Sequence, residues 1–271
     1  MSLPDRLARQ HPHPRDAHIL FDEGPHIYTI DGNSNYMSVT RWNHSHFEPF
    51  DAEKIICGMM ASPKWPRSKY FGQTKEEIKS LWHKNGQEAS NAGTKLHYDI
   101  ECFYNGQIPK NESIEYEYFL KFHRIHGVRM VPYRTEWMIW DKELKFAGSI
   151  DMVFEEENGM LQIYDWKRCK QIKKTNRWRS ATTQCIAHLP DTNYWHYSLQ
   201  LNTYKALLEK NYGKKVSKMY LICLHPTNET NSFMRFEVPD LGDEMRALFA
   251  LRYRQLEDRK LKKQVSRDHK L

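Results

Sequence analysis

The amino-acid sequence predicts an α/β protein in which a small mixed β-sheet is flanked by helices, with a mostly helical layer on its N-terminal side. Helical periodicity and capping signals dominate residues 51–126. Three apolar segments then follow with the partial alternation and turn-rich boundaries of β-strands, at about 131–140, 145–154 and 160–166. A helical segment precedes two further strands, and the three lie at about 196–211, 216–224 and 232–238. This mixture of elements is typical of the α/β class.

The elements before the first core strand are predicted from local signals. Residues 1–20 are expected to be irregular, and residues 25–40 are expected to form a hairpin that turns at residues 31–33. Helices with capping signals follow: one from the N-cap Asp51 to Met60, one opened by the Thr74/Glu77 capping box and continued to Tyr104, and one over 112–126 that stops at Gly127.

A single domain is predicted, because no internal repeat and no clear linker interrupts the chain. After the irregular segment 1–20, this domain would occupy residues 21–271. Its parts would be a hairpin with helices (21–127), a catalytic core (128–240) and a basic C-terminal helix (241–271).

Two carboxylates are expected to meet in the hairpin formed by the second and third core strands. Asn158 lies midway between Asp151 and Asp165, so a hairpin folded about it sets these residues opposite one another and on one face. Lys167 lies two residues further along the same face. Two such carboxylates repel each other unless a divalent cation lies between them. By itself the hairpin also fits a solvated strand pair, whose ion pair contributes less than about 1 kcal/mol.

Two helices carry polar pairs with a spacing of four residues, which places each pair on one helix face. His97 and Glu101 form the first pair, and an imidazole with a carboxylate suits the edge of a metal site or a hydrogen-bonded pair. Gln200 and Tyr204 form the second pair, on a helix with an apolar face. Taken alone, the first fits an ordinary surface histidine, and the second fits a hydrogen bond on the helix surface.

The order of these parts resembles the PD-(D/E)XK nuclease superfamily. The matching positions are Gly93-Thr94 with His97 on a helix, Glu136 on the first core strand, Gly148 with Asp151, Asp165 with Lys167, and Gln200 with Tyr204. The resemblance covers roughly residues 25–240 and is greatest to the RecB-like and phage-lambda-type exonucleases, including those of large DNA viruses and mitochondria. It implies a restriction-endonuclease-like core.

The resemblance also implies roles for single residues. Asp151, Asp165, the backbone carbonyl of Trp166 and His97 would bind one or two Mg²⁺ or Mn²⁺ ions, with Glu136 and Glu101 as further candidates. Lys167 would orient or deprotonate the attacking water, or offset negative charge on the phosphate. Gln200 and Tyr204 would position the substrate backbone or the lysine. A bound metal ion would supply hydroxide near neutral pH.

The charge distribution favours a polyanionic partner. The chain has 41 Lys and Arg against 34 Asp and Glu, a formal net charge of +7. A basic segment without acids begins at Lys167, and we predict that it contacts DNA through Arg168, Lys170, Lys173, Lys174, Arg177, Trp178 and Arg179. The alternative is a solvated loop. A second basic run, residues 252–270, is expected either to lie on DNA or to form a polar tail.

The five cysteines are far apart in the sequence, which argues against a metal or redox Cys-x-x-Cys motif and against an iron–sulfur cluster. Their odd number fits free thiols in a reducing compartment, such as cytoplasm, nucleus or viral factory, with the mitochondrion as an alternative. Without a signal-peptide core or a long apolar run, a soluble intracellular protein with no membrane contact is expected.

Taken together, the sequence predicts a metal-dependent DNA nuclease, more specifically an exonuclease that acts on DNA ends or single strands in recombination, repair or replication. One alternative is a structure-specific or nicking endonuclease on the same core, and another is a catalytically silent DNA-binding subunit. A metal-dependent enzyme with another substrate is a third. A homo-oligomer or a recombination partner protein is compatible with the sequence.

Overall fold

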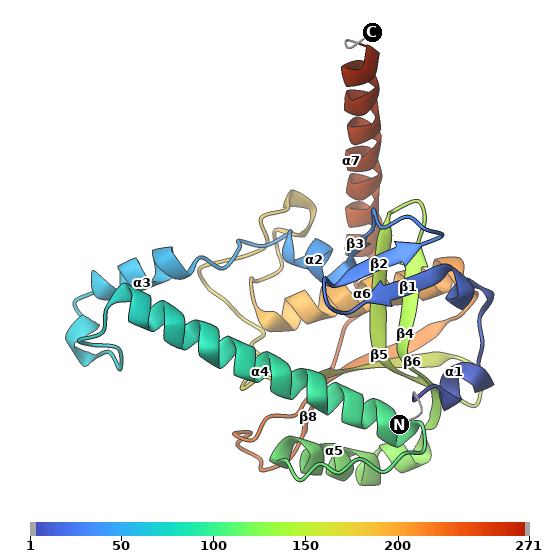
Figure 1. Ribbon diagram of the computed structural model, residues 1–271, viewed down its shortest axis with the longest axis horizontal. Helices are drawn as coiled ribbons and strands as arrows, with labels where there is room; N and C mark the ends of the chain where they lie inside the picture. Colours follow the sequence, from blue (N-terminus) through green and yellow to red (C-terminus); the bar gives the residue numbers. More distant parts are fainter. Residues whose placement is uncertain (1–3, 269–271) are drawn as a thin grey trace.

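The computed structural model describes residues 4–268, and within them a six-stranded mixed sheet is covered by helices on both faces (Figure 1). The strands are β3 Met37–Ser38, β4 Val131–Asp141, β5 Phe146–Glu155, β6 Leu161–Lys167, β7 Val216–Cys223 and β8 Met234–Glu237. Strand β5 pairs antiparallel with β4 and β6, whereas β3 with β5 and β6 with β7 are parallel pairs. Strand β8 pairs antiparallel with β7 and forms one edge of the sheet. The predicted fold class is confirmed.

Helices cover the two faces of this sheet and create two apolar cores. One core packs the long helix α4 (Lys75–Tyr104) and α5 (Ile114–Ile125) against β5, β6 and β7. The other packs α2 (Val39–His44), α6 (Asn193–Asn211) and the start of α7 (Gly242–Asp268) against the opposite face. The far half of α7 extends beyond the sheet (Figure 1). No helix in residues 4–268 is both long and apolar enough to cross a bilayer.

The N-terminal region differs from the expected arrangement. Residues 1–20 were expected to be irregular, but they include α1 (Arg6–Gln10), a 3₁₀ turn at Pro14–His18 and the start of β1. The hairpin consists of β1 (Ile19–Asp22) and β2 (Ile27–Ile30), which form a separate two-stranded sheet, so its turn precedes the predicted one. Strand β3, which was expected to be part of the hairpin over residues 25–40, instead pairs with β5 in the main sheet. The local turn signal at residues 31–33 is real, because Ile30 and Asn33 form a bridge, but it does not join two strands.

The predicted helices and their capping signals are confirmed. Helix α3 (Ala52–Met60) has Asp51 as its N-cap, whose side chain accepts a hydrogen bond from the backbone N–H of Lys54. Helix α4 begins with the predicted capping box of Thr74 and Glu77. The remaining described helical segments are 3₁₀ turns at Trp65–Arg67, Gly127–Arg129 and Gln184–Ile186.

The register of the β5–β6 hairpin is the predicted one. Met152 pairs with Tyr164 and Val153 with Ile163, so Asn158 lies at the centre of the turn. The β5–β6 ladder ends at the Met152–Tyr164 pair, and β3 pairs only with residues 146 and 147 of the same edge of β5. Residues 148–151 therefore have no strand partner on that edge among the described residues. This opening in the sheet contains Asp151.

Candidate active site

Three secondary-structure elements bring His97, Glu136 and Asp151 together at the opening in the sheet. Their potential ligand atoms all lie within 4.8 Å of one another. Nδ1 of His97, on α4, is 3.5 Å from Oδ2 of Asp151 on β5 and 3.8 Å from Oε1 of Glu136 on β4. The histidine and the glutamate, for which the sequence alone offered only weak arguments, are thus brought to the same point as the aspartate.

A local distortion of β4 turns Glu136 toward this point. Glu136 has φ 40°, a left-handed conformation that a non-glycine residue adopts at a cost of about 1–3 kcal/mol. The register of β4 and β5 places Glu136 between the Thr135–Met152 and Trp137–Ile150 pairs, opposite Asp151. Ser149 donates a hydrogen bond of 2.8 Å to the other carboxylate oxygen of Glu136. Strained backbone of this kind is typical of functional sites, because the surrounding structure must hold it in place.

The backbone of Trp166 connects the histidine to the aspartate. Its N–H donates a hydrogen bond of 2.9 Å to Oδ2 of Asp151, and its carbonyl accepts one of 2.9 Å from Nε2 of His97. The two predicted ligands, imidazole and carbonyl, are therefore adjacent. A metal ion that bound the Trp166 carbonyl and Nε2 of His97 would replace this hydrogen bond. A metal ion that bound His97 through Nδ1 would leave the hydrogen bond in place.

Asp165 and Lys167 form a buried ion pair next to this cluster. Nζ of Lys167 lies 2.7 Å from Oδ2 of Asp165, although the angle is not that of a hydrogen bond. The side chain of Asp165 is only 2% exposed and that of Lys167 is 16% exposed. The Lys167 ammonium also lies 4.6 Å from the centre of the Tyr197 ring, a cation–π contact. Asp165 is not part of the three-residue cluster, and its role as a metal ligand stays a prediction.

Gln200 and Tyr204 are bonded to each other on α6, with 3.1 Å between Nε2 and the phenol oxygen. The buried Tyr204 ring lies against β5 at Gly148, where an added Cβ would come within 2.9 Å of a ring carbon. Gly148 is therefore required for the close approach of α6 to the strand that carries Asp151. Tyr204 therefore packs directly against the strand that carries Asp151, and the role of Gln200 and Tyr204 in positioning the substrate backbone or Lys167 stays a prediction.

The electrostatics of the cluster reflect a surplus of carboxylates in a buried place. Burial and the neighbouring Asp165 raise the pKa of Asp151 to about 7, against the opposing effect of His97 and Lys167. Burial disfavours the imidazolium form of His97, but Asp151 and Glu136 outweigh it and raise its pKa to about 9. Burial and Glu136 likewise raise the pKa of Glu101 to about 7. Carboxylates with raised pKa values that share a buried site are typical of functional centres.

The donor set fits a hard or borderline divalent cation. One imidazole, two carboxylates and a nearby backbone carbonyl are ligands that Mn²⁺ and Mg²⁺ accept in proteins. A cation would also relieve the repulsion that raises the pKa of Asp151. Besides burial, the charge of the nearby Glu136 raises the pKa of Glu101. Glu101 itself lies outside the three-residue cluster.

The basic segment after β6 is irregular and mostly exposed. Lys170, Lys173, Lys174, Arg177, Trp178 and Arg179 are all exposed, and Trp178 reaches 92%. Arg168 differs, because its guanidinium is paired with Glu115 on α5 at 2.7 Å and is mostly covered. It ties α5 to the end of β6 and is not among the residues that we propose for DNA contact. The side chain of Arg179 lies 3.6 Å from Glu48.

Three residues around the site were not identified from the sequence. Tyr197 could have been found, because it lies three residues before Gln200 and seven before Tyr204 on one face of α6. Ser149 shares the face of Asp151 by the two-residue period of a strand. Tyr28 could not have been found from the sequence, because only the tertiary structure brings it close to Glu136 and Asp151. Burial and the charges of these two carboxylates raise the pKa of Tyr28.

The contributions of Asp151 and His97 to the free energy of unfolding of the metal-free protein are expected to fall as pH rises, over about 4–7 for Asp151 and about 6.5–9 for His97. Asp151 titrates near 3.8 when unfolded and near 7 when folded, and His97 near 6.5 and near 9. At each of these two groups the folded state binds more protons than the unfolded state in its interval, so that group stabilises the fold less as the pH rises. Buried histidines with lowered pKa values, such as His46, act in the opposite direction below about pH 6.5. Urea unfolding in EDTA across this range measures the effect. His97→Gln should flatten the upper half, whereas the exposed His188→Gln should not; equal curves for both variants would contradict the assignment.

Comparison with known proteins gives a match at the level of a family. The profile of the PD-(D/E)XK nuclease superfamily matches residues 73–268, which include His97, Glu136, Asp151, Asp165, Lys167, Gln200 and Tyr204. A crystal structure of a candidate exonuclease from Eubacterium rectale is similar with a TM-score of 0.39 and 10% identity, over 83% of this chain and 79% of that chain. A search of curated proteins finds no match.

Proposed function

Because the chain belongs to the PD-(D/E)XK nuclease superfamily, we propose that it is a Mg²⁺- or Mn²⁺-dependent deoxyribonuclease, and that it acts as an exonuclease on DNA ends. The observation that carries this proposal is the convergence of His97, Glu136 and Asp151 beside the Asp165–Lys167 ion pair. We also assign it to the RecB-like and phage-lambda-type group, on the order of its motifs, and to a role in recombination, repair or replication.

The protein's own residues would divide the work as follows. His97, Asp151, Glu136 and the Trp166 carbonyl would hold the metal, with Asp165 as a further ligand. When bound, the metal would polarise the scissile phosphate and lower the pKa of a water molecule. Lys167 would face the negative charge that develops on the phosphate oxygens.

The charge state of Lys167 favours one of its two predicted roles. Burial disfavours the ammonium form, but Asp165 and Asp151 outweigh it and raise the pKa of Lys167. A lysine that remains protonated can donate hydrogen bonds and offset charge, but it cannot accept a proton from water. We therefore propose charge stabilisation rather than general-base catalysis for Lys167, with Tyr197 and Asp165 holding its ammonium group in position.

The substrate would approach from the side of the basic segment. Lys170, Lys173, Lys174, Arg177 and Arg179 are exposed cations that could neutralise backbone phosphates, and the exposed ring of Trp178 is free to stack on a base. These residues follow Lys167 in the chain, and this short separation supports the proposal that they contact DNA next to the cluster.

Cleavage of linear and of covalently closed circular DNA tests the proposal. We expect wild-type protein to degrade linear DNA with Mg²⁺ or Mn²⁺ and to leave the circle intact, with no reaction in EDTA and none with Asp165→Ala. Nicking of the circle would replace the exonuclease by an endonuclease on the same core. If neither substrate is cleaved with any metal while DNA is still bound, the protein is a silent binding subunit.

A further inference from the structure

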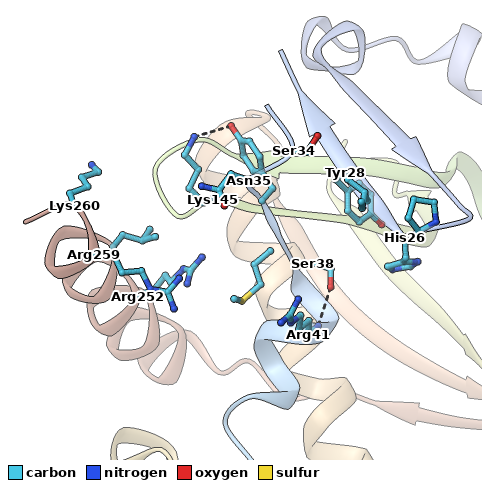
Figure 2. A pocket seen from close by; sticks show the side chains of 15 residues that line it. His26, Tyr28, Ser34, Asn35, Ser38, Arg41, Lys145, Arg252, Arg259 and Lys260 are labelled. Atoms are coloured by element: carbon cyan, nitrogen blue, oxygen red, sulfur yellow. Dashed lines mark hydrogen bonds between the residues drawn. The ribbon is translucent and has the colours of Figure 1, made fainter. Parts of the chain in front are cut away.

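A second basic surface lies away from the basic segment, in a hollow of about 930 Å³ between the β1–β2 hairpin, α2 and α7 (Figure 2). We call it the α7 pocket. Its size is near the upper end of the range for ligand pockets, about 300–1,000 Å³. Among its fifteen lining residues are five with cationic side chains, which come from three separate parts of the chain: Arg41, Lys145, Arg252, Arg259 and Lys260.

No ion pair within the described residues neutralises the positive charge of the α7 pocket. No carboxylate is among the lining residues, and none of the five cations forms an ion pair with any residue that the structure describes. Lys145 and Lys260 also border a neighbouring hollow that contains Glu143 and Glu257, and Arg252 and Arg259 border another that contains Asp258. Among the described residues, no ion pair joins these carboxylates to the five cations.

Arg252 is the fixed point of this arrangement. It is only 3% exposed, and its Nε donates a hydrogen bond of 3.0 Å to the backbone carbonyl of Leu144. Its two terminal nitrogens form no hydrogen bond within the described residues. Burial and the neighbouring Arg259 lower its pKa to about 10. A nearly buried guanidinium held beside a second one without a counterion is the arrangement expected of an anion-binding site.

The spacing of the cations indicates more than one anion. Arg252 and Arg259 are seven residues apart on α7, and therefore on one face and about 10 Å apart along the helix axis. Arg41 adds a third guanidinium from α2, opposite α7 (Figure 2). The five cations come from α2, the β4–β5 turn and α7 around a hollow of about 930 Å³, which has room for successive phosphates of one nucleic-acid strand. Tyr36 in the wall is only partly buried and offers a ring for base stacking.

The α7 pocket is connected to the candidate active site. The hydroxyl of Tyr28, one of its lining residues, is near enough to Glu136 and Asp151 for their charges to raise its pKa. Met37 and Ser38, also in the lining, pair with β5 at residues 146 and 147. Ala147 precedes Asp151 by four residues, about 13 Å of strand. A DNA strand could therefore span both places within a few nucleotides.

From these observations we infer that the α7 pocket binds consecutive backbone phosphates of a single DNA strand, the strand whose scissile phosphate lies at Asp151. The inference rests on the proposed nuclease function for the identity of the ligand. It makes α7 part of the substrate-binding surface, and it assigns Arg252, Arg259 and Lys260 of the C-terminal basic run to DNA contact rather than to a polar tail. The last two residues of that run, 269 and 270, lie outside the described residues.

Equilibrium binding in EDTA tests this inference without any cleavage. The probe is an internally labelled oligo(dT) of about 20 nucleotides, longer than the roughly 4–16 nucleotides that a single-strand site covers. It is prepared with phosphate or with hydroxyl at both ends. We expect Arg41→Gln/Arg259→Gln to weaken binding of both probes about tenfold or more, and to lower the slope of log affinity against log salt by about 0.7 for each lost contact.

Arg254→Gln is the matched control, because it removes the same charge from an exposed position of α7 that does not line the pocket. Its affinity should remain within about twofold of wild type. An unchanged affinity of the double variant would overturn the inference, and loss of preference for the phosphate-terminated probe alone would replace it by a terminal-phosphate site. Normal pocket-dependent binding without metal-dependent cleavage by wild type would overturn the nuclease proposal and leave the pocket intact.

Discussion

Lys167→Met is expected to lower kcat for DNA cleavage by about 100- to 10,000-fold, the effect of removing one well-placed charged or proton-transferring group. Methionine keeps most of the volume of the lysine stem against Tyr197 but removes the ammonium. The ammonium is proposed to interact with charge that develops only in the transition state. Its removal should therefore change the affinity for uncleaved DNA in EDTA only a little. Single-turnover cleavage and equilibrium binding measure the two effects separately.

The same substitution has a structural cost that must be separated from the catalytic one. Asp165 is buried with Lys167 as its ion-pair partner, and removal of one member of a buried pair destabilises proteins by about 3–5 kcal/mol. The double variant Asp165→Asn/Lys167→Met removes both charges and should recover much of the stability while remaining inactive. If the double variant recovered cleavage together with stability, Lys167 would be structural only.

Asp151→Asn is expected to remove the response of the protein to divalent metal ions and to lower kcat by about 1,000-fold or more, because a catalytic metal contributes several kcal/mol to the barrier. The amide oxygen can still accept the hydrogen bond from the N–H of Trp166, so the backbone at the opening should be preserved. In EDTA above pH 7, the variant should be at least as stable as wild type, since the raised pKa of Asp151 shows that its charged form is disfavoured when folded.

Thermal unfolding with and without Mn²⁺ provides the measurement. A ligand that binds only the folded state stabilises it by about 2.7 kcal/mol at a concentration of 100 Kd, so the Tm of wild type should rise. Glu157→Gln, which removes an exposed carboxylate at the turn of the same hairpin, should keep that rise. A wild-type rise that persisted in Asp151→Asn would show that the cation binds elsewhere.

The sequence by itself determined those features that depend on neighbouring residues. The N-cap Asp51 and the capping box at Thr74 mark two helix starts, because capping satisfies backbone N–H groups within one turn. The register of the β5–β6 hairpin follows from its short turn, and it sets Asp151 and Asp165 at the end of the ladder. The three core strands and α6 were predicted for the same reason, since their apolar periods are local.

Only the tertiary structure decided which long-range partners these elements have. The same turn residues at 31–33 are compatible with a hairpin, but β3 pairs with β5, and β1 is the partner of β2. The sequence groups Arg168 with the predicted DNA contacts, whereas the tertiary structure pairs its guanidinium with Glu115 on α5. The α7 pocket combines cations more than 200 residues apart in the sequence, such as Arg41 and Arg259. Contacts of this kind depend on how whole helices and sheets pack, and no local pattern of residues encodes them.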